Sequence, residues 1–205
     1  QGKVLMLAGI LCEKCGLPIV REGLCHHCRS EMPPFRALRA WAAFDFPVRQ
    51  ALHKLKYRRD MGLGDALAVP LADFTKSLSW PLDAILPVPL GRKRMQERGY
   101  NQVDLIARPL SLALGLDYRP AALKRRRETV SQVGLSALER RANMQNAFSA
   151  DASVVRGKTI LVMDDVSTTG STLSSCSDAL LQAGAKDVFA LTVARALPHN
   201  GLHQV

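Results

Sequence analysis

Aromatic residues are scarce in this sequence, since Phe, Trp and Tyr together make up 5% of its 205 residues. This scarcity argues against a protein that binds single-stranded nucleic acid mainly by stacking bases on many rings. Long apolar runs are missing too, because none approaches the roughly 20 residues that span a bilayer. The short apolar stretch Val4–Leu11 is followed by no polar linker or small-residue cleavage site before Cys12. We therefore expect a cytoplasmic protein without a membrane span.

Two common nucleotide-binding signatures are also missing. The sequence contains neither the GxxxxGK[ST] pattern of a P-loop nor the GxGxxG pattern of a dinucleotide site. ATPase and dehydrogenase activities therefore lose their main support. What is present is the composition of an ordinary globular protein, with 47% hydrophobic and 22% charged residues, which suffices for one hydrophobic core.

Positive charge is abundant and unevenly distributed. Lys and Arg number 28 against 18 Asp and Glu, which gives a formal charge of +10. Residues 1–60 hold 11 basic and 5 acidic side chains and residues 91–141 hold 12 and 5, whereas residues 61–90 and 142–205 are slightly acidic. The two basic blocks predict an anionic partner such as nucleic acid, phosphate or an acidic membrane, although a solvated helix surface has the same composition.

Four of the five cysteines form two pairs, Cys12 with Cys15 and Cys25 with Cys28, each with a two-residue gap. Two such turns that face each other can hold one zinc ion through four thiolates. Two disulfides are disfavoured by a reducing compartment, and a redox pair is disfavoured because no strand–helix–strand pattern surrounds it. We therefore expect a closed, structural zinc site. Cys176 stands apart in an apolar helical pattern and is expected in the core.

Strand and helix signals alternate along the rest of the chain, after a connector expected around Trp41–Pro47. Helices are expected over Val48–Arg59, Ala66–Ser77, Arg92–Arg98, Gln102–Leu114 and Thr172–Ala183, with a break at Gly62–Gly64. Strands are expected within Asp83–Leu90, Lys158–Met163 and Val188–Ala194. This alternation predicts an α/β fold, a parallel sheet flanked by helices, with ligands at the carboxyl ends of the strands.

The most specific motif is Ile160–Thr172, in which a buried strand leads into two carboxylates, a turn rich in hydroxyl groups and a helix. A turn of this kind directs backbone N–H groups and hydroxyls at an anion, so a phosphate is expected on Thr168–Thr172. The carboxylates of Asp164 and Asp165 can accept hydrogen bonds from vicinal sugar hydroxyls, directly or through Mg²⁺.

This motif closely resembles the phosphoribosyl-pyrophosphate (PRPP) loop of type I phosphoribosyltransferases, and the whole chain resembles the ComF family, also named competence protein F, ComFC or GntX. The resemblance extends over essentially the full length. Besides the PRPP loop it includes the four paired cysteines, Leu55-Lys56-Tyr57, Pro87-Val88-Pro89-Leu90, Arg98–Gln102, Thr129 with Gln132, and Arg141 with Asn143.

The resemblance implies a type I phosphoribosyltransferase-like sheet in residues 46–205 and a zinc-binding module with its connector in residues 1–45. It implies that Asp164 and Asp165 are the catalytic carboxylates and bind the ribose hydroxyls. The PRPP-binding residues would be Asp164, Asp165, Val166, Ser167, Thr168, Thr169, Gly170, Ser171 and Thr172.

The same resemblance implies a second set of residues, around the pyrophosphate. Pro87–Leu90 corresponds to the pyrophosphate loop, and the basic segment Lys124–Arg141 corresponds to the loop that closes over the leaving group in active relatives. The residues implied are Pro87, Val88, Pro89, Arg92, Arg94, Arg98, Arg125, Arg126 and Arg127. Cationic side chains there could neutralise pyrophosphate, DNA or both.

Three functions follow from the resemblance. The first is a competence protein that binds PRPP and single-stranded DNA during DNA uptake (natural transformation), with a helicase as its partner. The second is an active phosphoribosyltransferase that uses Mg²⁺ with PRPP and transfers the phosphoribosyl group to an acceptor that the sequence does not identify. The third is a non-catalytic nucleotide sensor that retains the fold.

Overall fold

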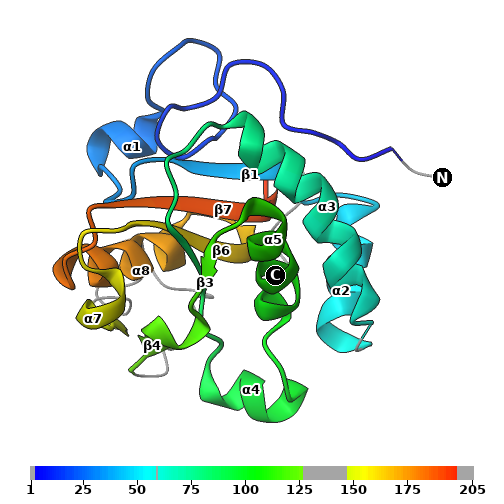
Figure 1. Cartoon of the computed structure of the whole chain (residues 1–205). Coiled ribbons are helices and arrows are strands. Elements are labelled where there is room, and N and C mark those ends of the chain that lie inside the picture. Colours follow the sequence, from blue (N-terminus) through cyan, green and yellow to red (C-terminus); the bar gives the residue numbers. More distant parts are fainter. Residues whose placement is uncertain (1–2, 59, 127–146, 198–205) are drawn as a thin grey trace.

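A five-stranded parallel sheet forms the centre of the protein (Figure 1), as seen in a computed structural model that describes residues 3–58, 60–126 and 147–197. All of its strand pairs are parallel, and the strand order is β1-β7-β6-β2-β3. The strands are β1 (Leu38–Ala43), β2 (Ala84–Pro87), β3 (Asp117–Tyr118), β6 (Thr159–Ser167) and β7 (Asp187–Arg195). The expected parallel sheet is therefore confirmed.

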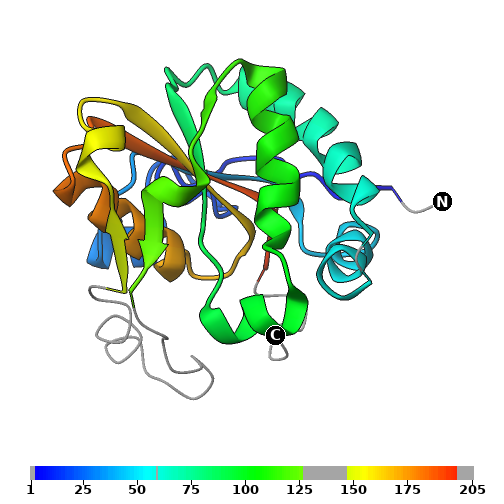
Figure 2. The same ribbon diagram turned by 60° about the horizontal axis from the view of Figure 1, so that its bottom comes forward.

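Helices cover both faces of this sheet (Figure 2). One face packs against α2 (Val48–Tyr57), α3 (Gly62–Ser77) and α5 (Gln102–Leu114), and the other packs against α8 (Ser171–Gln182). Successive side chains of a strand point to opposite faces, so the apolar run of β6 supplies both cores. Leu161 and Met163 pack in the core with α2, α3 and α5, whereas Ile160 and Val162 pack in the core with α8.

The remaining elements are short. They are α1 (His26–Ser30), α4 (Arg92–Arg98), the 3₁₀ turn η1 (Pro120–Ala122), α7 (Ala152–Val155) and the antiparallel pair β4 (Leu123–Arg125) and β5 (Phe148–Ala150). Among the described helices, none has the length and apolar character needed to cross a membrane.

Two local expectations are wrong. The connector expected around Trp41–Pro47 is in part a strand, because β1 runs to Ala43 and pairs with β7 along the sheet edge. The expected break at Gly62–Gly64 is the first turn of α3. Gly64 lies where α3 packs against α5, and a Cβ atom there would be 2.3 Å from the carbonyl oxygen of Leu105. A residue without a side chain therefore lets α3 approach α5 closely.

Candidate functional site

β2 ends beside the residues that precede the two aspartates of β6, since Pro87, the last residue of β2, is paired with Met163. β6 leads through Asp164 and Asp165 into the turn before α8, and β2 leads through a proline-containing loop into α4. In an open parallel sheet this edge is where ligands bind. The structure therefore brings the two predicted ligand loops to one edge.

The turn from Thr168 to Gly170 is shaped by a left-handed residue and by hydroxyl groups. Gly170 has φ +84° and, as the N-cap residue of α8, has no side chain that could cap the helix. The Ser171 N–H, the first of that helix, donates a long hydrogen bond of 3.4 Å to Thr169 Oγ1. Thr169 Oγ1 and Ser171 Oγ lie 2.7 Å apart. A small pocket at this turn is lined by Asp164, Val166, Ser167, Thr168, Thr169, Gly170, Ser171, Thr172 and Leu173. Backbone N–H groups, hydroxyls and the positive end of the α8 dipole make it suited to a phosphate.

Asp165 is held on the other side of β6 by a network of side chains. The Lys56 ammonium lies 2.7 Å from Asp165 Oδ2, and the Gln102 amide donates a hydrogen bond of 3.1 Å to the same oxygen. Arg98 in turn donates to Gln102 Oε1 and lies over the Tyr57 ring, 5.3 Å from its centre. The network thus links α2, α4, α5 and β6 at the site.

Asp164 is in a different electrostatic environment, although it is the neighbouring residue. Burial and the adjacent charge of Asp165 raise the pKa of Asp164 to about 8. The Asp165 N–H donates a hydrogen bond of 2.8 Å to Asp164 Oδ1, which opposes the rise because it favours the carboxylate form. Two carboxylates with such different surroundings can take different roles in one site.

The loop after β2 is fixed by Asn101. Its side-chain amide donates to the carbonyl oxygen of Val88 at 3.0 Å, and its Oδ1 accepts from Val103 N at 3.2 Å and caps α5. The N–H of Val88 also donates to the Met163 carbonyl at 2.8 Å. The Pro87–Leu90 loop is therefore tied to both β6 and α5.

Four cysteines form a second site, at the N-terminal end of the chain. The Sγ atoms of Cys12, Cys15, Cys25 and Cys28 all lie within 4.8 Å of one another, and those of Cys15 and Cys25 are 3.7 Å apart. A tetrahedral zinc site with bonds of about 2.3 Å requires sulfur atoms nearly this close. The predicted ligands are thus brought together in an arrangement that could hold a metal ion.

The protonation chemistry of this cluster also fits a cation. Burial opposes ionisation of Cys12, but hydrogen bonds from nearby backbone N–H groups outweigh it and lower the pKa of this thiol to about 6. Burial and the adjacent Cys15 thiol raise the pKa of Cys28. A divalent cation would remove the mutual repulsion that opposes four thiolates in one place.

The cysteine cluster is attached to the sheet by two arginines. Arg195, at the end of β7 and only 4% exposed, donates to the Cys15 carbonyl at 2.6 Å and approaches Cys15 Sγ at 3.7 Å. Arg39 of β1 donates to the Glu13 carbonyl at 3.1 Å. The N–H of Leu38 also donates to the Lys14 carbonyl at 2.7 Å. The cluster therefore rests on the edge of the sheet, although the expected boundary between residues 45 and 46 stays a prediction.

The predicted basic residues are only partly brought together. Arg98 joins the Asp165 network, whereas Arg92 and Arg94 lie on the exposed surface of α4. Arg125 of β4 lies over the Phe148 ring at 5.4 Å, and the N–H of Arg126 donates to the Ala147 carbonyl. Arg127, Thr129, Gln132, Arg141 and Asn143 lie outside the described residues.

Four residues with clear positions in these sites were given no role from the sequence. The residues are Lys56, Asn101, Gln102 and Arg195. The ComF resemblance includes the first three as parts of motifs, which is the signal that could have found them. Arg195 carries no such signal, because an arginine at the end of an apolar strand resembles an ordinary strand terminus.

Comparisons with known proteins find relatives that align along most of this chain. Residues 104–201 match the family model described as phosphoribosyl transferase domain. The DNA utilization protein YhgH of Escherichia coli O157:H7 is 37% identical over 194 residues, which cover 91% of this chain and 85% of that protein. Competence protein F of Haemophilus influenzae is 33% identical over 218 residues, which cover 96% of this chain and 95% of that protein. Among solved structures, the glutamine PRPP amidotransferase of B. subtilis has a TM-score of 0.43 at 22% identity, over 69% of this chain and 26% of that one.

Proposed function

Because the chain belongs to the ComF family, together with competence protein F and DNA utilization protein YhgH, we propose that it binds PRPP at the carboxyl edge of its sheet and handles single-stranded DNA during DNA uptake. The cytoplasm is the proposed location, where a helicase would be the partner. The cysteine cluster would hold a structural zinc ion, since its four sulfur ligands leave no open position for a substrate.

One observation carries the PRPP proposal. Asp164 and the hydroxyl-rich turn line one pocket at the start of α8. The N-cap residue Gly170 offers no side chain to the first N–H groups of that helix, and the Ser171 N–H reaches Thr169 Oγ1 only at 3.4 Å. A 5′-phosphate bound at Thr168–Thr172 would satisfy those N–H groups. The ribose hydroxyls would then lie toward Asp164 and Asp165, where carboxylate oxygens can accept their hydrogen bonds.

The diphosphate of PRPP would lie toward the loop after β2. Asn101 and the Met163 carbonyl fix Val88 there. The helix α4 begins shortly after this loop and contains three arginines, Arg92, Arg94 and Arg98. Mg²⁺, for which carboxylate and phosphate oxygens are suitable ligands, would neutralise charge on the diphosphate. The three arginines would bind the diphosphate oxygens, and Arg125, Arg126 and Arg127 would add further positive charge.

A second function, transfer of the phosphoribosyl group, is favoured by the paired carboxylates. An acceptor atom would form a bond to the anomeric carbon of PRPP while the bond to the diphosphate oxygen breaks, and diphosphate would leave with that electron pair. A proton lost by the acceptor would pass to solvent or to the diphosphate. The residues here would contribute by positioning the ring and neutralising the leaving group, which needs no dedicated base.

Titration calorimetry with PRPP and Mg²⁺ tests the PRPP site. We expect binding to the wild type and at least tenfold weaker binding to the Asp164→Asn/Asp165→Asn variant. Asp73→Asn, an exposed aspartate of α3, is the matched control and should bind like the wild type. Equal binding by all three proteins would remove the assigned site. Release of pyrophosphate with amine, base or nucleotide acceptors would then separate transfer from binding alone.

Titration of a labelled single strand tests the DNA part of the proposal. Binding to the basic surface should weaken steeply between about 50 and 200 mM salt, because each neutralised phosphate releases counterions. Binding that ignores salt, or that is no stronger than binding to an acidic polymer without bases, would contradict a role in handling DNA.

A further inference from the structure

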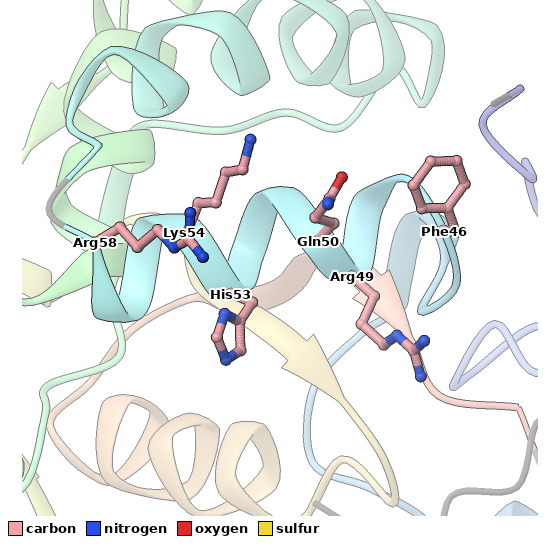
Figure 3. A pocket seen from close by; sticks show the side chains of 6 residues that line it. All are labelled: Phe46, Arg49, Gln50, His53, Lys54 and Arg58. Carbon is pink, nitrogen blue, oxygen red and sulfur yellow. The ribbon is translucent and has the colours of Figure 1, made fainter. Parts of the chain in front are cut away.

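The exposed side of α2 carries positive charge without any negative charge. Its sequence, from Val48 to Tyr57, contains no acidic residue. A hollow of about 390 Å³ along this helix is lined by Phe46, Arg49, Gln50, His53, Lys54 and Arg58. These side chains project along the whole length of α2, with Arg49 and His53 on the same side of it (Figure 3). We refer to these six residues together with Tyr57 as the α2 surface.

In the described part of the chain, no acidic side chain forms a salt bridge with a residue of the α2 surface. The salt bridges found among the described residues join Lys56 to Asp165, and both Arg119 and Lys158 to Asp117. The charges of Arg49, Lys54 and Arg58 are therefore available to an external anion. Several cations spaced along a ten-residue helix, which is about 15 Å long, are better matched to an anion with repeated charges than to one phosphate.

Aromatic rings lie among these cations. Phe46 is 54% exposed and Tyr57 is 65% exposed, at the two ends of α2. The Tyr57 ring lies 4.7 Å from the His53 ring and has the Arg98 guanidinium over it at 5.3 Å, so contacts within the protein position the tyrosine. Rings that alternate with cations are typical of surfaces that bind unpaired bases and their phosphates. Duplex DNA keeps its bases stacked, and would leave these rings unused.

The α2 surface also adjoins the proposed PRPP site. Lys56, which precedes Tyr57, reaches Asp165, and Arg98 contacts both Tyr57 and the Gln102 side chain that binds Asp165. We propose that the α2 surface is the binding site for single-stranded DNA, with Arg49, Lys54 and Arg58 on its phosphates and Tyr57 stacked on a base beside the PRPP site. This inference rests on the proposed function, and gives its DNA partner a location.

The test uses fluorescence anisotropy of a labelled oligothymidylate of about 15 nucleotides and the full chain. The triple variant Arg49→Ala/Lys54→Ala/Arg58→Ala should bind at least tenfold more weakly. Its salt dependence should also fall, by about 0.7 in the logarithmic slope for each phosphate that the variant no longer neutralises. The matched control removes three exposed cations from other surfaces, Arg21→Ala/Lys76→Ala/Arg108→Ala, and should keep most of the affinity.

A second pair of variants tests the ring. Tyr57→Ala should weaken binding of the oligothymidylate about tenfold, Tyr57→Phe should not, and neither should change binding of inorganic polyphosphate, which has no bases. If the wild type binds the strand but the two triple variants lose affinity equally, the α2 assignment fails while the proposed function stands. If the wild type does not bind the strand, the DNA part of the proposed function fails as well. A duplex bound as tightly as the single strand would overturn the choice of ligand.

Discussion

Lys56 and Asp165 form an ion pair that is largely removed from water, with side chains 20% and 8% exposed. A buried carboxylate left without its cation is costly, because it keeps the desolvation penalty and loses the compensating attraction. The Gln102 hydrogen bond to the same oxygen would only partly replace that attraction. At the scale of single residues, the position of Asp165 in the proposed PRPP site therefore depends on this pair.

We therefore predict that Lys56→Met lowers the free energy of unfolding at pH 7 by about 2–4 kcal/mol. The variant Lys56→Met/Asp165→Asn should recover most of this loss, because no unpaired charge remains in the interior. Urea unfolding of the wild type, both single variants and the double variant measures the coupling. A double variant whose loss equals the sum of the single losses would show that the two side chains are not coupled.

The raised pKa of Asp164 predicts that the stability of the protein depends on pH. Its pKa is raised to about 8, whereas an aspartate in an unfolded chain has a pKa near 3.9. The folded protein therefore binds the proton more tightly, so its stability decreases as the pH rises from about 4 to 8. Asp164→Asn keeps an oxygen for the Asp165 N–H and has no charge to bury.

The melting temperature of Asp164→Asn relative to wild type should therefore increase with pH. We expect a small difference between the two melting temperatures at pH 5, and a variant that melts several degrees higher than wild type at pH 8.5. Thermal unfolding followed by circular dichroism at both pH values provides the measurement. The same difference at the two pH values would show that Asp164 does not titrate in this range.

At the scale of elements, the contact between α3 and α5 depends on Gly64. An alanine there would place its Cβ 2.3 Å from the Leu105 carbonyl oxygen, so the two helices would have to separate. We predict that Gly64→Ala lowers the free energy of unfolding by about 1–3 kcal/mol. Gly62→Ala, two residues earlier in the same helix, is the control, because its nearest neighbour would be 4.0 Å away. Chemical unfolding should show no loss for the control, and equal losses in both would contradict the close approach.

Elements with strong local signals were predictable from the sequence. The helix over Gln102–Leu114 has the bounds expected, because Asn101 caps its first turn and Gly115, with φ +67°, ends it. β6 was predicted too short, since Asp164 and Asp165 resemble the end of a strand. Pairing with β7 extends it to Ser167, and such pairing cannot be read from the β6 sequence alone.

Contacts between distant residues were not predictable in the same way. The segment Leu38–Ala43 is rich in alanine, which has little strand propensity. It forms the strand β1 because it pairs with β7. The ion pair of Lys56 with Asp165 joins residues from separate elements, and only the folded arrangement brings them together. The sequence motif predicts the two carboxylates, whereas the side chains that hold Asp165 are found only in the structure.

At the scale of the whole molecule, the cysteine cluster and the proposed phosphate loop share a support. Arg195 binds the Cys15 carbonyl, and in the sheet it is the register partner of Ser167, which precedes the loop. The next N–H, that of Ala196, donates to the Ser167 carbonyl at 2.9 Å. A change in the cysteine cluster would therefore disturb one end of β7 and, through it, the start of the loop.

We predict that Cys28→Ser lowers bound zinc well below the one ion per chain expected for a four-cysteine site. The melting temperature should fall by on the order of 10 °C, and PRPP should bind more weakly. Cys176→Ala is the control, since Cys176 is a buried residue of α8 and lies outside the cluster. Atomic absorption, thermal unfolding and calorimetry measure the three effects. Zinc retained by Cys28→Ser, or lost by the control, would contradict the assignment of the ligands.

The central claim is that one edge of the sheet binds PRPP, and that the α2 surface beside it binds single-stranded DNA. The most direct measurement is a crystal structure obtained with PRPP, Mg²⁺ and a short oligonucleotide. We predict the 5′-phosphate on Thr168–Thr172, the ribose beside Asp164 and Asp165, and the DNA phosphates along α2. PRPP bound at another place would contradict the assigned PRPP site. An oligonucleotide bound away from α2, with PRPP at its predicted site, would contradict the assigned DNA site.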